Sequence, residues 1–160
     1  MTAALASWNA DKFHDSTLGR FDFINIMSYD KTGPWNISKT GQHSPYQMAA
    51  DDFNYYSTTR GIAKEKLLIG LPFYSYGFGG NAPASMSYKE IIRQYPGAEN
   101  SDSLSVNGGK IYYNGIATIA RKVKFAKDNR AAGVMIWQLL QDSRDNKSLL
   151  NVIYQSATGK

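Results

Sequence analysis

The sequence predicts an α/β fold in which four strand–helix units form a parallel sheet. Short apolar segments rich in β-branched and aromatic residues alternate four times with segments whose apolar residues recur at helical spacing. The length of 160 residues and the hydrophobic content of 42% are ordinary for a single globular domain. Four such units are half of an eightfold βα barrel, a fold that typically needs about 250 residues.

Four segments are predicted to be the strands of this sheet. The clearest is Phe21–Met27, an apolar run interrupted only by Asp22 and Asn25, which is typical of a strand buried on both faces. Pro72 has no backbone N–H to donate, so it marks the end of a strand. The other three predicted strands are Thr2–Ser7, Leu67–Phe73 and Gly133–Trp137.

Helices are predicted between these strands. Ser44 as N-cap and Pro45 at the first helical position favour a helix over Pro45–Thr59. Apolar residues at helical spacing predict a long helix over Gly115–Asp128. Its basic residues are expected to form one solvated face, namely Arg121, Lys122, Lys124 and Lys127. Shorter helices are expected over Asp11–Leu18, after the capping box Ser87–Glu90, and over Ser148–Tyr154.

One segment, residues 87–113, breaks the alternation and is predicted to be a small α+β insertion. After a short helix over Ile91 and Ile92, Asn107-Gly108-Gly109 predicts a tight turn between two short strands. The preceding stretch, Tyr74–Gly80, is interpreted as a glycine-rich, aromatic loop. No Lys-Ser or Lys-Thr follows its glycines, so it is not a phosphate-binding loop.

Composition excludes several classes of function. With no cysteine there is no disulfide or thiolate metal site, and neither His14 nor His43 has partners at ligand spacing, so we expect no metal and no cofactor. The net charge of +5 comes from scattered residues, which does not favour nucleic-acid binding. No apolar run approaches the roughly 20 residues of a membrane span. Serine-hydrolase and dinucleotide-binding motifs are also missing.

Aromatic and polar residues gather where the predicted strands end. All three tryptophans of the chain lie near such ends. Because the carboxyl ends of barrel strands share one face, these side chains should surround one hollow. Flat rings stack on the C–H faces of sugars while polar groups bind their hydroxyls, so the pattern favours a carbohydrate cleft; the alternative is that the aromatics only cap the core. The residues concerned are Trp8, Met27, Tyr29, Asp30, Trp35, Tyr74, Tyr76, Trp137, Gln138 and Asp142.

Three strand ends also carry motifs. Met27-Ser-Tyr-Asp30 follows the second strand, Leu71-Pro-Phe-Tyr74 ends the third, and Gly133-Val-Met-Ile-Trp137 forms the fourth. In this order and approximate spacing they resemble the fifth through eighth strands of glycoside hydrolase family 18, the chitinase family. The resemblance covers essentially the whole chain. It implies half of a (β/α)8 TIM barrel, with the 87–113 insertion before the last unit.

The resemblance implies a role for each matching residue. In this family the N-acetyl oxygen of the substrate acts as the nucleophile. Tyr29 would hydrogen-bond the acetamido group and Asp30 would orient the sugar, which makes them the candidate catalytic residues. Met27 would line the pocket and Trp137 would form its floor. The other candidate substrate-binding residues are Trp35, Trp8, Tyr74 and Gln138.

The family's general acid has no counterpart in this sequence. That acid is a Glu ending an Asp-x-x-Asp-x-Asp-x-Glu motif on the fourth strand, and no such motif occurs here. The pair Asp51-Asp52 is interpreted as part of a solvated helix face. Losing a general acid forfeits about 10²–10⁴ in rate, so the chain alone is expected to be inactive.

These observations leave three hypotheses for function. In the first, the chain is the sugar-recognition half of a chitinase or endo-β-N-acetylglucosaminidase, acting on β-1,4-linked N-acetylglucosamine by a retaining mechanism and completed by the missing N-terminal half-barrel or a second copy of the chain. In the second, it is a lectin-like, non-catalytic chitin-binding protein. In the third, it is a half-barrel that self-assembles without ligand. For an enzyme of the first kind we expect a secreted or periplasmic parent protein, with its export signal outside these residues.

Overall fold

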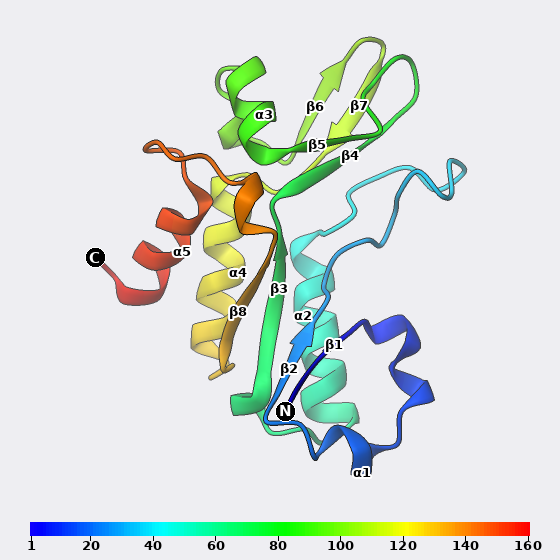
Figure 1. Cartoon of the computed structure of the whole chain (residues 1–160), viewed down its shortest axis with the longest axis vertical. Coiled ribbons are helices and arrows are strands. Elements are labelled where there is room, and N and C mark those ends of the chain that lie inside the picture. Colours follow the sequence, from blue (N-terminus) through cyan, green and yellow to red (C-terminus); the bar gives the residue numbers. More distant parts are fainter.

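The computed structural model describes all residues 1–160 and contains a four-stranded parallel sheet (Figure 1). Its strands are β1 (Thr2–Leu5), β2 (Phe23–Ile26), β3 (Leu67–Pro72) and β8 (Gly133–Trp137), in the order β1-β2-β3-β8. All three neighbouring pairs are parallel. The predicted α/β class with a parallel sheet is therefore confirmed. Strands β1 and β8 form the two free edges of this sheet.

Helices cover one face of this sheet (Figure 1). They are α2 (Tyr46–Asn54), which continues as a π-helical turn over Tyr55–Thr59, α4 (Ile116–Asp128) and α5 (Leu149–Thr158). The expected helix over Asp11–Leu18 is instead a 3₁₀ segment, Ser7–Lys12, followed by the short α1 (Asp15–Leu18). Further 3₁₀ turns occupy Lys64–Lys66, Ala98–Asn100 and Leu139–Gln141.

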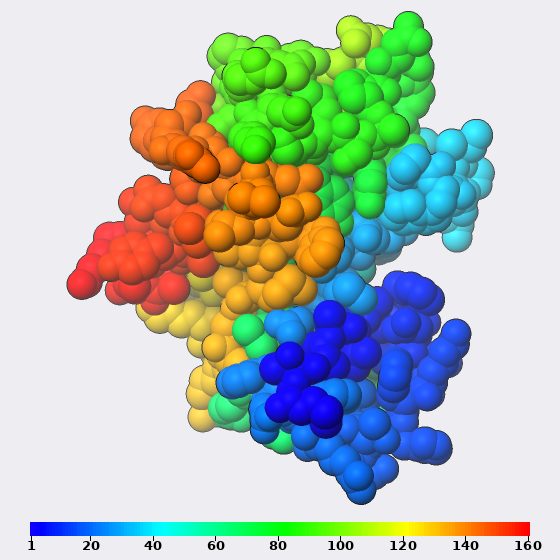
Figure 2. All heavy atoms as spheres, in the orientation of Figure 1, coloured from blue at the N-terminus to red at the C-terminus, as the bar shows by residue number.

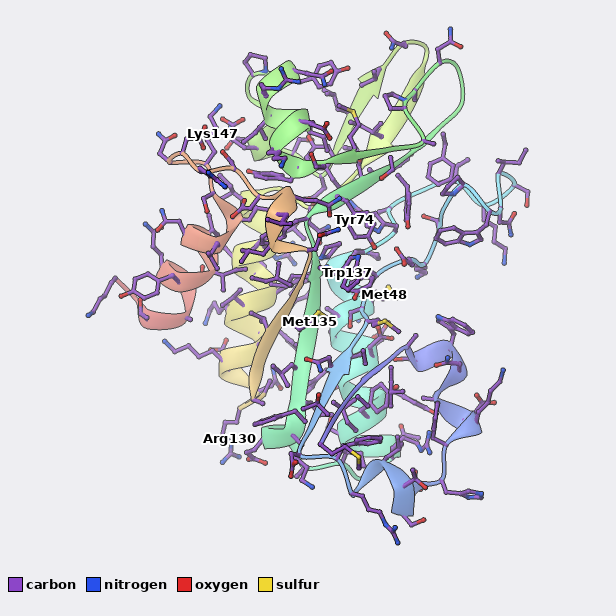
Figure 3. The ribbon with its side chains drawn as sticks, in the orientation of Figure 1. Met48, Tyr74, Arg130, Met135, Trp137 and Lys147 are labelled. Atoms are coloured by element: carbon purple, nitrogen blue, oxygen red, sulfur yellow. The ribbon has the colours of Figure 1, made fainter.

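The two faces of the parallel sheet differ sharply in burial. Side chains alternate between the faces of a strand, so Ile24, Ile26, Leu67, Ile69 and Leu71 all point toward the helices, and all five are fully buried. The opposite face carries Phe23, which is 44% exposed, and Trp137, which is 55% exposed. Figure 3 shows Met135 and Trp137 along β8 on this open face.

A second, antiparallel sheet is inserted between β3 and α4. Its strands are β4 (Tyr74–Phe78), β5 (Ser85–Ser87), β6 (Ser103–Val106) and β7 (Gly109–Tyr112), in the order β5-β4-β7-β6, and α3 (Tyr88–Gln94) packs beside it. The sheet has a separate small core made of Met86, Ile91, Ala98, Val106, Ile111 and Tyr113.

The prediction of a loop over Tyr74–Gly80 is wrong, because most of this stretch forms β4. The inserted sheet therefore begins at Tyr74 rather than at residue 87. The glycines of this stretch had suggested a loop. A Cβ at Gly77 would lie 2.1 Å from the carbonyl oxygen of Pro83, so this glycine permits close backbone approach within a strand.

Two charged side chains that were predicted to be solvated are buried. Lys122 of α4 is fully buried and Asp52 of α2 keeps only 8% exposure. Their neighbours on the same helices, Asp51 and Lys124, are exposed as expected. No helix in the structure has the length and apolar character needed to cross a membrane.

Adjacent residues of β3 test the difference between the two sheet faces. Ile69→Ala should lower the free energy of unfolding by about 2–5 kcal/mol, because Ile69 is fully buried against the helices. Leu68→Ala should cost about 1 kcal/mol or less, because Leu68 is only half-buried on the open face. Urea denaturation of both variants measures the difference. Equal losses would contradict the assignment of the faces.

Candidate functional site

The candidate site is built on the loop of residues 27–45, which connects β2 to α2. Asp30 adopts the left-handed conformation with φ +65°, which Asp tolerates better than most residues and which turns the chain away from the sheet. The backbone N–H of Lys31 donates to the carbonyl of His43 at 2.9 Å, so the two ends of the loop lie side by side. Trp35 projects from the segment between them.

This loop forms one wall of a cleft of about 610 Å³. Five of the predicted site residues line it: Trp8, Met27, Tyr29, Asp30 and Trp35. The remaining lining residues are Ala6, Ser7, Lys31, Met48, Asp51 and Asp52. Figure 2 shows a recess between the dark-blue N-terminal segment and the light-blue loop. Trp8 and Trp35 are 75% and 61% exposed, so their rings offer flat apolar surface to a ligand.

Tyr29 forms a buried part of the cleft. A Cβ at Gly70 would lie 2.8 Å from the Tyr29 ring and 2.4 Å from the carbonyl oxygen of Ile26, so the glycine in β3 makes room for this ring. Burial, followed by the nearby charge of Asp30, raises the pKa of Tyr29 to about 12. The hydroxyl therefore stays protonated at neutral pH and is available as a hydrogen-bond donor.

Asp30 is held as a carboxylate. Burial alone would raise its pKa, but the combined effect of His43, Tyr74 and Tyr76 outweighs burial and brings the pKa below the ordinary value. The clearest of these contacts is the Tyr74 hydroxyl, which donates to Asp30 Oδ1 at 2.5 Å. Because the side chain keeps 39% exposure, the carboxylate can still accept hydrogen bonds from a ligand.

His43 lies on the buried side of Asp30. Its Nε2 lies 3.2 Å from the carbonyl oxygen of Tyr74, and we assign Nε2 as the donor because a carbonyl can only accept. Its Nδ1 lies 3.8 Å from Asp30 Oδ1, which is beyond hydrogen-bond distance, and this contact attracts the carboxylate only when the ring carries both protons. Burial, which outweighs the opposing carboxylate, lowers the pKa of His43.

An aromatic cluster joins this site to the inserted sheet. The rings of Tyr74 and Tyr76, both on β4, lie 5.3 Å apart, and each lies 5.0 Å from the His43 ring. Trp35 meets Tyr76 edge to face at 5.2 Å. Tyr74, predicted to bind substrate, contacts Asp30 from behind and does not line the cleft.

Sequence reasoning missed the roles of His43 and Asp52. His43 was considered only as a metal ligand, and its position just before the Ser44-Pro45 helix start was the available signal. The Oδ2 atom of Asp52 is buried without a hydrogen-bond partner, next to the cleft. Burial raises the pKa of Asp52, while Ser7 and Ser28 oppose that effect.

Trp137 and Gln138 lie outside this cleft. Both are exposed at the end of β8, where Trp137 pairs with Pro72 and points to the open face of the sheet. A larger recess of about 1240 Å³ lies between α3 and residues 139–151, and of the residues predicted at strand ends it contains only Asp142. No group of three or more His, Asp or Glu side chains is arranged to hold a metal ion.

A sequence comparison identifies the family. The model of the glycosyl hydrolases family 18 matches residues 2–142. The chain belongs to this family. The match covers most of the chain and confirms the resemblance carried by the three strand-end motifs.

Solved structures of family 18 enzymes share this fold. The chitinase ChiB from the chitin utilization locus of Flavobacterium johnsoniae is 40% identical, with a TM-score of 0.86, and the match covers 99% of this chain and 50% of ChiB. A chitinase from Bacteroides thetaiotaomicron is 35% identical with a TM-score of 0.84, covering 100% of this chain and 52% of that enzyme.

Curated relatives give the same picture. Human chitinase-3-like protein 2 is 27% identical over 167 residues, which cover 79% of this chain and 43% of the relative. The chain therefore spans about half the length of the solved family 18 enzymes and less than half of this relative.

Tyr74→Phe tests the support of Asp30. The variant loses the hydroxyl that donates to the ionised carboxylate, so the pKa of Asp30 should rise. Titration of the side-chain carboxyl carbon by NMR measures this pKa directly. Tyr154→Phe, at an exposed position far along the chain, is the matched control and should leave it unchanged. An unchanged Asp30 pKa in Tyr74→Phe would contradict the described contact.

Proposed function

We propose that this chain supplies the sugar-recognition half of a site that hydrolyses β-1,4-linked N-acetylglucosamine glycans. The observation that carries the proposal is the cleft in which Tyr29 and Asp30 lie between two exposed tryptophan rings. Membership of family 18 adds the reaction class, in which the substrate's own acetamido oxygen attacks the sugar.

In this proposal Tyr29 and Asp30 bind different groups of the acetamido sugar. The protonated Tyr29 hydroxyl donates a hydrogen bond to the acetamido oxygen and stabilises the charge that develops as this oxygen attacks C1. The ionised Asp30 accepts hydrogen bonds from the sugar and fixes its orientation. Trp8 and Trp35 stack on flanking sugar rings, and Met27 adds apolar contact. No cofactor is involved.

Relatives with the same fold hold the expected ligand class. A mutant class V chitinase from Nicotiana tobaccum was solved in complex with NAG4, and a mutant catalytic domain of an Ostrinia furnacalis chitinase was solved with (NAG)5. These proteins are 24% and 19% identical to this chain, so the comparison with them shows a shared fold and nothing more. An oligomer of N-acetylglucosamine is accordingly the ligand that we assign to the cleft.

The parallel sheet is, in our proposal, half of a (β/α)8 barrel. Two features support this: β1 and β8 are free edges, and the sheet face opposite the helices exposes Phe23, Met135 and Trp137. A second set of four strands would pair with both edges and bury that face. Closure would also bring Trp137 and Gln138 to face the completed pocket, as the family resemblance implies.

The general acid is expected to come from outside these residues. Glu65, Glu90 and Glu99 all lie away from the carboxyl ends of the parallel strands, and Glu90 is committed to the cap of α3. The chain alone should therefore bind N-acetylglucosamine oligomers without cleaving them.

Two assays of the 160-residue chain test this statement. A fluorogenic chitobiose substrate should show no turnover, while titration with an N-acetylglucosamine oligomer should quench tryptophan fluorescence. Tyr29→Phe should weaken that binding about tenfold, because one hydrogen bond to a buried carbonyl is worth about 1.4 kcal/mol. Clear turnover by the chain would refute the missing acid. Binding that Tyr29→Phe leaves intact would refute the assigned role of Tyr29.

Complementation tests the half-barrel. The first four βα units of ChiB from Flavobacterium johnsoniae can be co-expressed with this chain, since the chain aligns with 50% of that enzyme. We expect a 1:1 complex by size-exclusion mass, hydrolysis of the chitobiose substrate, and protection of Trp137 from solvent quenchers. A chain that stays monomeric and forms no complex would contradict the proposal.

A non-catalytic, lectin-like function is the second candidate. It predicts oligomer binding without turnover by the complete parent protein. The N-terminal half-barrel of the parent separates the two: an Asp-x-x-Asp-x-Asp-x-Glu motif there makes the parent an enzyme, and a substituted Glu makes it a binding protein. A third, purely structural role for a self-assembled half-barrel predicts no oligomer binding at all.

A further inference from the structure

A fully buried ammonium group lies beneath the candidate site. Lys122 of α4 has no exposed surface, and its Nζ donates to three neutral oxygens. These are the carbonyl oxygen of Ser44 at 2.8 Å, the hydroxyl of Ser44 at 2.7 Å and the side-chain oxygen of Asn114 at 2.7 Å. An ammonium group has three protons to donate, so each proton makes one of these three hydrogen bonds.

Ser44 links Lys122 to the residues that follow β2 and form the site. Its hydroxyl donates to the carbonyl oxygen of Ser28 at 2.6 Å, and Ser28 directly precedes Tyr29 and Asp30. Ser44 also directly follows His43, the residue beside the Asp30 carboxylate. Lys122 therefore contacts the point where both ends of the loop 27–45 meet.

The same cluster ties this loop to the inserted sheet. The amide of Asn114 donates to the Ser44 carbonyl at 2.9 Å. Gln42 donates to the carbonyl oxygens of Asp102 at 3.1 Å and Tyr113 at 2.5 Å. The loop itself contains no helix or strand between Met27 and Pro45, so these contacts determine its shape.

We propose that Lys122 is a positioning residue for glycan binding: through Ser44 it fixes the base of the loop 27–45 and thereby holds Tyr29, Asp30 and Trp35 in the cleft. Lys122 touches no ligand and acts only through its three hydrogen bonds. The effect of Lys122 on glycan binding rests on the proposed sugar-binding function. The effect of Lys122 on the shape of the loop does not depend on that function.

Two carboxylates act on this cation without pairing with it directly. Asp52 of α2 and Asp102, just before β6, act on it through charge alone, and His43 also senses its charge. Burial, which these carboxylates only partly oppose, lowers the pKa of Lys122 to about 7. As the pH rises through 7 the amine loses a proton, so one of the three hydrogen bonds that join Lys122 to Ser44 and Asn114 is lost.

The experiment compares Lys122→Met with Lys124→Met in the full chain. Lys124 lies on the same helix, is 72% exposed and pairs only with Asp128, so it is the matched control. Two quantities are measured: amide hydrogen exchange in residues 28–44 without ligand, and affinity for an N-acetylglucosamine oligomer between pH 6 and pH 8.5. Ser44→Ala, which removes the hydroxyl that links Lys122 to Ser28 and leaves the bond from Lys122 to the Ser44 carbonyl, serves as a second variant if Lys122→Met fails to fold.

Lys122→Met and Ser44→Ala should accelerate exchange in residues 28–44 at least tenfold relative to α5, and should weaken oligomer binding at least tenfold. The affinity of the unmodified chain should fall as the pH rises through 7, while that of Lys122→Met should not change. A folded variant with unchanged loop exchange and affinity would overturn the inference. If the unmodified chain binds no oligomer but Lys122→Met still loosens the loop, the proposed function has failed and the positioning role stands.

Discussion

The burial of one sheet face under three helices is the constraint on which the rest of the structure depends. Isoleucine and leucine side chains from β2 and β3 fill that interface, and their removal from water supplies the main driving force for folding. Because all four strands are parallel, their carboxyl ends lie together at one end of the sheet. Polar and aromatic groups there cost little stability, since they follow the core residues without replacing them.

The site forms because two further elements cover the end of the sheet where the carboxyl ends of the strands lie. The loop 27–45 brings Trp35 back toward Tyr29 and Asp30, and β4 continues from β3 so that Tyr74 reaches the Asp30 carboxylate. The resulting arrangement keeps one tyrosine neutral and one aspartate ionised within the same cleft. Such a donor and acceptor pair suits an acetamido sugar, which offers a carbonyl oxygen and several hydroxyls.

The parallel strands and the strand-end residues could be predicted from the sequence because each depends on local patterns. Apolar runs predicted the four strands of the parallel sheet, and the Met-x-Tyr-Asp motif put Tyr29 and Asp30 just after the second strand, where both line the cleft. Lys122 and Asp52 could not be predicted, since a charged residue on an amphipathic helix is normally solvated and only tertiary contacts supply the oxygens that surround Lys122. Strand β4 was missed because glycine weakens strand propensity, whereas here Gly77 allows the Pro83 segment to approach.

The separate core of the inserted sheet has a consequence for divergence within this family. Met86, Ile91, Ala98, Val106, Ile111 and Tyr113 pack among themselves and not into the main core. Substitutions within this small core should therefore act mainly on the inserted sheet. The ties to the scaffold lie elsewhere, since Tyr88 and Ile92 of α3 enter the main core and Tyr74 of β4 contacts Asp30, so the outer strands β6 and β7 can vary in length without disturbing either contact.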